Sequence, residues 1–173
     1  MEENEIGRLI QDSAVENIWE GTTQTLALDV VRVLEKSKGM AAKAFIEWSK
    51  EIVKRVPASL KVDTDSLAAS LDAVAAATTV YVGGGTPDPR LATVLLMHIG
   101  YTASALYLLE QAIWSHQRTG EEGELDAIVV NHWIQVGSDT RRQVLSFVQA
   151  DKAGAASARL AESYIVYGRS SKL

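Results

Sequence analysis

The sequence predicts an all-α protein, an antiparallel helical bundle, from three observations. Apolar residues recur at spacings of three and four along almost the whole 173-residue chain, which is the period of an amphipathic helix. No stretch alternates apolar and polar residues between hairpin turns, as strands do. Alanine is abundant and there are only 3 prolines, which favours helix. We expect a single domain over 1–173, because this length suits one continuous core.

Two helices are expected near the amino terminus. A short first helix covers about 6–14. After the break made by Trp-Glu-Gly, a second helix runs over about 23–38, because Thr22 suits an N-cap and Gly39 a stop. The helical spacing predicts inward stripes made of Ile6, Leu9, Ile10 and Ala14 in the first helix, and of Leu26, Val30, Val33 and Leu34 in the second.

The third and fourth helices are expected over about 41–55 and 64–81. Pro57 ends the third, and the Asp-Thr-Asp-Ser run at 63–66 caps the fourth. Residues 83–89, Gly-Gly-Gly-Thr-Pro-Asp-Pro, follow no strand and precede no Gly-Lys-Ser/Thr, so they favour an ordinary loop over a phosphate cradle. The predicted inward stripes are Phe45, Trp48, Ile52 and Val53 in the third helix, and Leu67, Leu71, Val74 and Thr78 in the fourth.

A long helix over about 88–117 has no charged residue between 91 and 109, which approaches the length of a membrane span. The polar residues inside this run, and the lack of a basic cluster at either end, favour a central helix buried by its neighbours. No membrane partner is therefore expected. His98, inside the run, is interpreted as a core histidine with satisfied hydrogen bonds.

Three more helices are expected over about 124–136, 139–149 and 151–167, after the acidic connector at 119–124. The first would turn Leu125, Ile128, Val129 and Trp133 inward, and the second Val144, Leu145 and Val148. Packing in the core is the expected role of Trp48, Trp114 and Trp133.

Composition narrows the possible functions. The formal net charge is -5 and the pI near 5.2, so the electrostatic attraction on which nucleic-acid binding rests is missing and no nucleic-acid partner is expected. The absence of cysteine excludes disulfides and thiolate chemistry. The 3 histidines have no ligand partners at helical spacing, so no metal site is expected.

The expected layout is a lead-in helix and loop over about 1–22, a bundle over 23–168 and a tail over 169–173. The acidic amino terminus has no secretory pattern. The tail carries Ser171, Lys172 and Leu173, the tripeptide that a peroxisomal import receptor reads at a carboxyl terminus. This tripeptide predicts a peroxisomal protein, except in an organism without peroxisomes, where it is silent.

The stretch Ile-Trp-Glu-Gly-Thr-Thr-Gln at 18–24 holds the candidate chemistry. Glu20 stands between an indole and a glycine, where the backbone can bend sharply. Partial burial beside an apolar group would raise the pKa of this carboxyl toward that of a usable base. The spacing equally fits a polar residue in a turn before a capped helix, so both readings stay open at this point.

The sequence from Arg8 to Arg32, RLIQDSAVENIWEGTTQTLALDVVR, resembles the carboxyl-terminal helical domain of the flavin-dependent acyl-CoA dehydrogenases. It is most similar to their AidB-like branch, in which a tryptophan precedes Glu-Gly-Thr and Leu-Ala-Leu-Asp-Val-Val-Arg follows. Residues 100–114, GYTASALYLLEQAIW, are also similar to that branch. The resemblance thus implies an all-α fold like that domain.

The resemblance implies a role for three side chains. Glu20 would be the base that removes the α-proton of an acyl-CoA thioester, and its backbone N–H would help to hold the thioester carbonyl. Thr22 and Gln24 match positions that touch FAD. Thr23 departs from the family, in which serine or asparagine is common at its position.

The same resemblance implies that most of the flavin and acyl-CoA site belongs to amino-terminal and middle domains that this sequence lacks. The chain would then be the carboxyl-terminal portion of the enzyme, inactive alone and either a homo-oligomer or a subunit that complements the missing domains. Two alternatives stay open: a catalytically silent helical oligomerisation or interaction module, and a truncated gene product that keeps the loop without a function.

Overall fold

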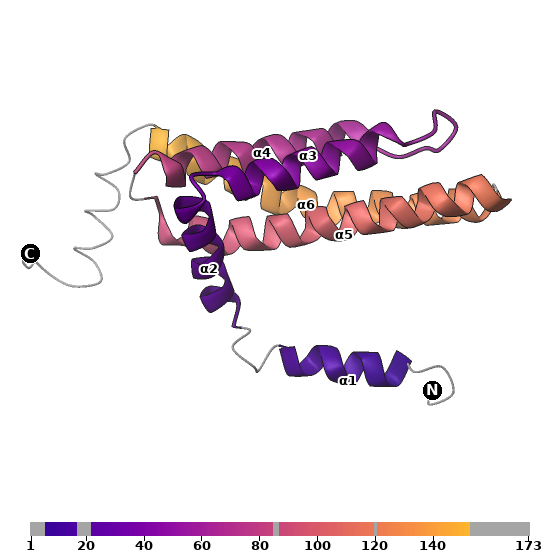
Figure 1. Ribbon diagram of the computed structural model, residues 1–173, viewed down its shortest axis with the longest axis horizontal. Coiled ribbons are helices and arrows are strands. Elements are labelled where there is room, and N and C mark those ends of the chain that lie inside the picture. The colour runs from indigo at the N-terminus through magenta and orange to yellow at the C-terminus, as the bar shows by residue number, and fades with distance from the viewer. Residues whose placement is uncertain (1–5, 17–21, 85–86, 120, 153–173) are drawn as a thin grey trace, which may run out of the picture.

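The computed structural model describes residues 6–16, 22–84, 87–119 and 121–152. Within these ranges the chain forms helices and no strand, which confirms the predicted all-α class (Figure 1). The helices are α1 (Ile6–Glu16), α2 (Thr23–Lys36), α3 (Met40–Lys54), α4 (Thr64–Val82), α5 (Pro89–Thr119) and α6 (Glu121–Lys152).

The helices α3, α4, α5 and α6 lie lengthwise beside one another and make an elongated bundle (Figure 1). The two longest, α5 and α6, form a hairpin that shares more contacts than any other pair. At one end of the bundle α2 crosses α5 and also contacts α3 and α4. This crossing fixes where the start of α2, with Thr22 and Gln24, lies on the bundle.

The core forms two clusters along the length of the bundle. One joins α2, α3 and α4 to the start of α5 and the end of α6, and includes Leu34, Val74, Leu91, Leu95 and Val144. The other joins α3 and α4 to the second half of α5 and the first half of α6, and includes Ile52, Leu67, Leu106, Leu109 and Val130. Alanines occupy many buried positions in both clusters, because a small side chain lets two helices approach closely.

The predicted helix ends in the first half of the chain are largely confirmed. Gly39 has a left-handed backbone with φ of 81° and separates α2 from α3. Asp63 is the N-cap of α4, and its Oδ1 accepts a hydrogen bond from the Ser66 N–H at 3.0 Å. The hydrogen bonds from Ser66 lower the pKa of the Asp63 carboxyl, which favours the charged capping form. The inward stripe of this helix, Leu67, Leu71, Val74 and Thr78, is buried as predicted.

The predicted break between helices at 137–138 is wrong, because α6 runs unbroken from Glu121 to Lys152. Gly137 is buried in the interior of that helix, and a Cβ added there would lie 3.3 Å from the Tyr101 Cβ. The glycine therefore serves the close approach of α6 to α5 rather than a turn. Of the predicted helix over 151–167, residues 151 and 152 belong to α6 and the others lie outside the described residues.

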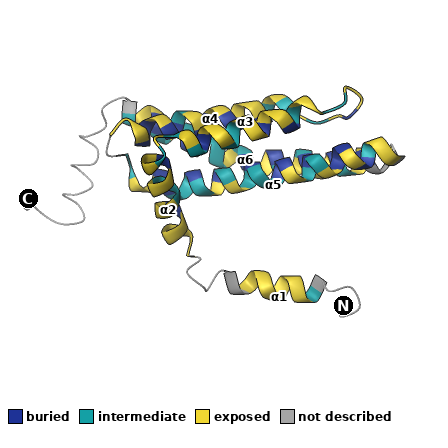
Figure 2. Cartoon of the chain, viewed as in Figure 1, coloured by how far each residue is buried: buried dark blue, intermediate teal, exposed yellow. Residues whose placement is uncertain are grey.

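The predicted inward stripe over 124–136 is wrong for three of its four residues, while Trp133 is partly buried and packs against the second core cluster. Leu125 is 66% exposed and Ile128 65% exposed, while Ala127, Val130 and Ile134 are buried. Figure 2 shows that the helices of the bundle carry both buried and exposed residues along their length. The apolar residues of this helix outnumber its core positions, so some large ones, such as Leu125 and Ile128, are left at the surface. Other side chains that the helical spacing placed inward are also exposed. They are Leu9, Ile10, Leu26, Val33, Trp48, Trp114 and Val129.

The long helix α5 is the predicted central helix. Leu91, Leu95, Leu106 and Leu109 on it are fully buried against its neighbours. By length and composition alone α5 could span a membrane, yet such a test is also passed by the core helix of a soluble protein. In its most apolar window 39% of the residues are buried, so α5 carries more apolar surface than the described helices cover.

Candidate functional site

The residues assigned by the resemblance lie at and before the start of α2. Glu20 falls in 17–21, outside the described residues, as do Ser171, Lys172 and Leu173. Thr22 is the N-cap of α2 by position, with an extended backbone at φ −62° and ψ 132°. Its hydroxyl does not cap the helix but lies 2.8 Å from the Thr25 Oγ1. Gln24 stands in the first turn and is exposed.

Gln24 borders a hollow of about 630 Å³ where α2 crosses α5 and α6. Because these helices are distant in sequence, no local motif announces the site, and sequence reasoning missed all of its members except Gln24. The lining residues are Gln24 from α2, Arg90, Thr93 and Val94 from α5, and Arg142, Gln143, Ser146 and Phe147 from α6.

Carboxylates balance the two guanidinium groups of this hollow. Arg90 Nη2 lies 2.7 Å from Asp88 Oδ2 and Arg90 Nε 3.0 Å from Asp88 Oδ1, and the Arg90 guanidinium also stands over the Phe147 ring at 5.3 Å. Arg142 pairs with Asp139. Both arginine side chains are largely exposed, so the hollow offers oriented N–H donors, amides and hydroxyls to a polar ligand without a strong net charge.

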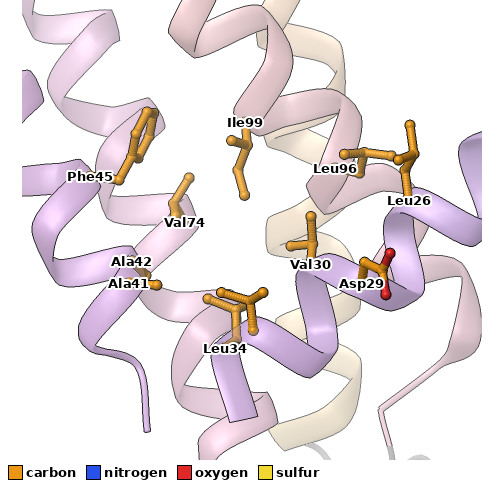
Figure 3. Close-up of a pocket in the computed structure, with 11 residues that line it drawn as sticks. Leu26, Asp29, Val30, Leu34, Ala41, Ala42, Phe45, Val74, Leu96 and Ile99 are labelled. Atoms are coloured by element: carbon orange, nitrogen blue, oxygen red, sulfur yellow. The ribbon is translucent and has the colours of Figure 1, made fainter. Parts of the chain in front are cut away.

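The opposite side of α2 borders an apolar groove of about 400 Å³ (Figure 3). Asp29 at its edge is the only charged residue of the lining and pairs with Arg32. The lining residues are Leu26, Asp29, Val30, Val33 and Leu34 from α2, Ala41, Ala42 and Phe45 from α3, Val74 from α4, and Leu96 and Ile99 from α5. The helix that follows Glu20 thus separates a polar hollow from an apolar one.

Neither hollow contains an evident catalytic group. The polar hollow is lined by amides, hydroxyls and arginines, and the groove by aliphatic and aromatic side chains plus the paired Asp29. Among the described residues no group of three or more His, Asp or Glu is placed to hold a metal ion. The described part of the chain therefore offers two hollows that can bind a ligand, and neither contains a side chain that the resemblance names as a base.

The reading of His98 as a core histidine is confirmed. The ring is fully buried, with Nε2 at 3.0 Å from the Ser70 carbonyl and Nδ1 at 3.1 Å from the Thr140 hydroxyl. Burial lowers the pKa of His98, and the nearby Arg141 adds to that effect against the hydrogen bonds to Ser70 and Gly137. The imidazole is therefore held neutral and joins α4, α5 and α6 inside the bundle.

A serine–histidine pair that the sequence did not reveal lies at the far end of the bundle. Ser59 Oγ is 2.8 Å from His116 Nε2. His116 Nδ1 is buried without a hydrogen-bond partner in the part of the chain that the structure describes, so no carboxylate there orients the ring as a nucleophile's base requires. The pair ties the connection between α3 and α4 to the end of α5 and is structural.

Comparisons with known proteins found no matching family model, no matching curated protein and no matching solved structure.

Proposed function

We propose that this chain is the carboxyl-terminal portion of an FAD-dependent acyl-CoA dehydrogenase of the AidB-like branch, with Glu20 as the catalytic base. The observation that carries the proposal is the run from Arg8 to Arg32, in which Trp-Glu-Gly-Thr is followed by Leu-Ala-Leu-Asp-Val-Val-Arg. The position of α2 supports it, because this helix places Gln24 beside a polar hollow immediately after the Glu20 loop.

The proposed reaction introduces a double bond between the α and β carbons of an acyl-CoA thioester. The Glu20 carboxylate takes the α-proton, and the electrons of that C–H bond become the new π bond as the β-carbon loses a hydride. FAD, when bound, accepts this hydride. The Glu20 backbone N–H would donate to the thioester carbonyl and stabilise the negative charge that develops there, which makes the α-proton easier to remove.

The polar side chains at the start of α2 support a contact with one edge of a flavin cofactor. Thr22 offers a hydroxyl and Gln24 an amide, both exposed at the start of α2, and the neighbouring hollow adds the N–H donors of Arg90 and Arg142. These groups can hold polar atoms and phosphate oxygens. They do not enclose a ring system, so the proposal requires further domains to bind most of FAD and of the acyl-CoA.

Complementation tests this proposal. The chain is mixed with separately produced amino-terminal and middle domains of an AidB-like acyl-CoA dehydrogenase, and flavin absorbance is followed after gel filtration. We expect a flavoprotein whose absorbance is bleached by acyl-CoA, because the mixture holds both base and hydride acceptor. Glu20→Gln should lower the bleaching rate at least a thousandfold, since an amide cannot take the proton, a loss on the scale of removing a general base together with its positioning.

Glu35→Gln, at the exposed carboxyl end of α2, is the matched control and should bleach like the unmodified chain. A mixture that takes up no flavin, or a Glu20→Gln variant that bleaches at the normal rate, contradicts the proposed function.

A helical oligomerisation module is the second candidate. It is favoured by exposed apolar side chains at helical spacing, which a protein that acts alone rarely leaves in numbers. They occur on α1, α2, α5 and α6 and include Leu9, Ile10, Leu28, Val33, Tyr107, Trp114, Leu125 and Ile128. A stable oligomer that neither takes up flavin nor complements the missing domains would support this candidate over the first.

We also propose that Ser171, Lys172 and Leu173 direct the protein to peroxisomes. A fluorescent protein fused to the amino end of the chain should collect in peroxisomes, because the import receptor reads this tripeptide with its terminal carboxylate. Deletion of Leu173 should leave the fusion in the cytosol, and fluorescence microscopy against a peroxisomal marker measures both. Unchanged import after the deletion would remove the claim, and deletion of Met1 or Glu2 serves as the control.

A further inference from the structure

The helix α1 has an apolar side that the described bundle leaves uncovered. Leu9 is 66% exposed and Ile10 61% exposed, and α1 lies apart from the other helices (Figure 1). The helix has 11 residues, and isolated helices shorter than about 12–15 residues are only marginally stable in water. A helix of this length therefore gains stability when its apolar side packs on another surface.

An uncovered apolar surface lies on the next helix of the chain. The apolar groove borders α2 (Figure 3), and in its lining Leu26 is 43% and Val33 52% exposed. Residues 17–22 separate α1 from α2, and a connection of this length is common between packed helices. It reaches up to about 20 Å at about 3.3–3.6 Å per residue, whereas the axes of packed helices lie about 8–10 Å apart. The groove is therefore within reach of α1.

An antiparallel pairing of α1 with α2 matches the two helices position by position. When residue 16 is set opposite residue 23, Leu9 faces Val30 and Ser13 faces Leu26. The facing residues are four apart on both helices, which belongs to the spacing of a helix-pairing seam. The small Ser13 side chain then leaves space for the larger Leu26, as packed helices require.

The same register turns Ile10 toward the floor of the groove. In an antiparallel helix pair, the residues that directly follow the facing positions lie on the same side of both helices. On α2 these residues are Ala27 and Val31, which pack in the first core cluster. Ile10 holds the corresponding position on α1, so it points toward the bundle, where Phe45 and Ile99 line the groove (Figure 3).

The groove has room for these side chains, and the charged groups stay outside the contact. The side-chain atoms of Leu9 and Ile10 together need about 240 Å³, at about 30 Å³ for each heavy atom, the share of a water molecule in the liquid. The groove has a volume of about 400 Å³. Arg8 lies 4.0 Å from Asp12 on the polar side of α1, so the pairing buries apolar groups and leaves this ion pair in water.

From these observations we infer that α1 folds back antiparallel to α2 and covers the apolar groove of its own chain. The connection favours α1 over a free apolar ligand, because a tethered segment acts at an effective concentration on the order of millimolar. A membrane is a poorer partner for α1, since the helix carries Arg8 against Asp12 and Glu16, whereas membrane surfaces attract basic helices. This contact goes beyond the proposed dehydrogenase role and needs neither flavin nor further domains.

Disulfide formation within one chain tests the pairing, because the sequence has no native cysteine. Ser13→Cys with Leu26→Cys places two thiols opposite each other, and a disulfide needs Cβ atoms roughly 4 Å apart. Gln11→Cys with Leu26→Cys is the matched control, since Gln11 lies on the polar side of α1 only two residues away. Under mild oxidation the first pair should form its intrachain disulfide about tenfold faster than the control, as measured by mass spectrometry after alkylation of the free thiols.

Equal rates for the two pairs overturn the inference, because a helix that swings freely would bring either of its sides to Leu26. Disulfides that form between chains and not within one also overturn it, and would assign the groove to α1 of a second copy. Circular dichroism establishes that both double variants keep their helical content.

Binding of the dye anilinonaphthalene sulfonate, which fluoresces on exposed apolar surface, tests whether α1 covers the groove. Ile10→Glu should raise the fluorescence about threefold, because a carboxylate does not enter an apolar groove and the freed groove takes up the dye. Gln11→Glu adds the same charge on the polar side of α1 and should leave the fluorescence unchanged.

Unchanged or lower fluorescence of a folded Ile10→Glu variant overturns the inference, since the groove would then be open in the unmodified chain as well. Sedimentation of the unmodified chain with phosphatidylcholine vesicles, lost in Ile10→Glu and accompanied by equal disulfide rates, would assign α1 to a membrane and overturn it too.

Discussion

Replacement of Gly123 by alanine is expected to lower the free energy of unfolding by about 2 kcal/mol. Gly123 lies in the first turn of α6, and a Cβ there would be 2.5 Å from the His116 Cα and 2.7 Å from the His116 N. Backbone atoms cannot rotate away as a flexible side chain can, so α5 and α6 must separate locally. Such overpacking costs about 1–3 kcal/mol, and a clash with backbone atoms belongs at the upper end of that range. The roughly 1 kcal/mol that alanine gains over glycine in a helix then leaves a net loss of about 2 kcal/mol.

Thermal unfolding followed by circular dichroism measures this effect, which corresponds to a fall in the melting temperature of about 4–8 °C for a chain of this size. Gly100→Ala is the matched control, because a Cβ added at Gly100 on α5 meets nothing within 4 Å. This variant should be stabilised by about 0.5–1 kcal/mol. Equal effects of the two substitutions would show that the close approach at Gly123 carries no stability.

The glycines also explain which helix boundaries could be predicted. Gly39 stops a helix because its φ of 81° suits a residue without a side chain. Gly137 looks the same in sequence, yet it lies inside α6 against Tyr101. A glycine that ends a helix and a glycine that lets two helices touch differ in which residues of other helices lie against them. The local sequence around a glycine does not contain that information. The predicted break at 137–138 failed for this reason.

Helical periodicity identified the elements more reliably than their buried faces. In α4 large apolar residues are few and alanines are many, and the inward stripe through Leu67 and Val74 was correct. In α5 and α6 large apolar residues occur on both faces, while alanines such as Ala105 and Ala127 fill close contacts in the core. A prediction that turns the largest apolar residues inward therefore placed Ile128 in the core. The distance between the axes of two packed helices decides which side chain fits between them, and here that distance suits alanine.

The candidate site was predictable only where its residues are consecutive. Thr22 and Gln24 follow from the Glu-Gly-Thr run, but the hollow beside Gln24 depends on Arg90 and Phe147, which come from two other helices. Their meeting follows from the crossing of α2 over the α5–α6 hairpin, which no local pattern encodes. The hollow is thus an observation independent of the resemblance on which the dehydrogenase proposal rests, and it lies beside one of the residues that the resemblance names, Gln24.

Acid is expected to destabilise the bundle through His98. Below pH 6.5, the ordinary pKa of histidine, the unfolded chain takes up a proton at this ring. The folded chain resists protonation because burial lowers the pKa of His98. Stability is therefore complete above that pH and falls as the pH drops toward the folded pKa, by at most about 1.4 kcal/mol per pH unit for one proton.

The surroundings of the ring explain why it stays neutral. A carbonyl can only accept, so Nε2 carries the proton and donates it to Ser70 O of α4. Nδ1 lies 3.1 Å from the hydroxyl oxygen of Thr140 in α6. That hydroxyl has a single proton, and it also lies 2.8 Å from the Gly137 carbonyl oxygen, to which it can donate. Arg141 is the charged group that acts on the ring, and its cation opposes a second positive charge there. None of the described groups that act on the ring is a carboxylate, so a protonated ring would have hydrogen bonds but no counter-charge from them.

Urea unfolding between pH 5 and pH 8 separates this effect from general acid destabilisation. His98→Leu keeps an apolar side chain of similar size in the core and removes the titrating group, so its stability should vary less with pH below 6.5 than that of the unmodified chain. His132→Gln changes an exposed histidine of α6 and should leave the pH profile as it was. If His98→Leu and the unmodified chain lose stability in parallel as the pH falls, protonation of other groups governs the acid response. A steeper loss in the unmodified chain alone means that the ring joining α4, α5 and α6 is the acid-sensitive point of the bundle.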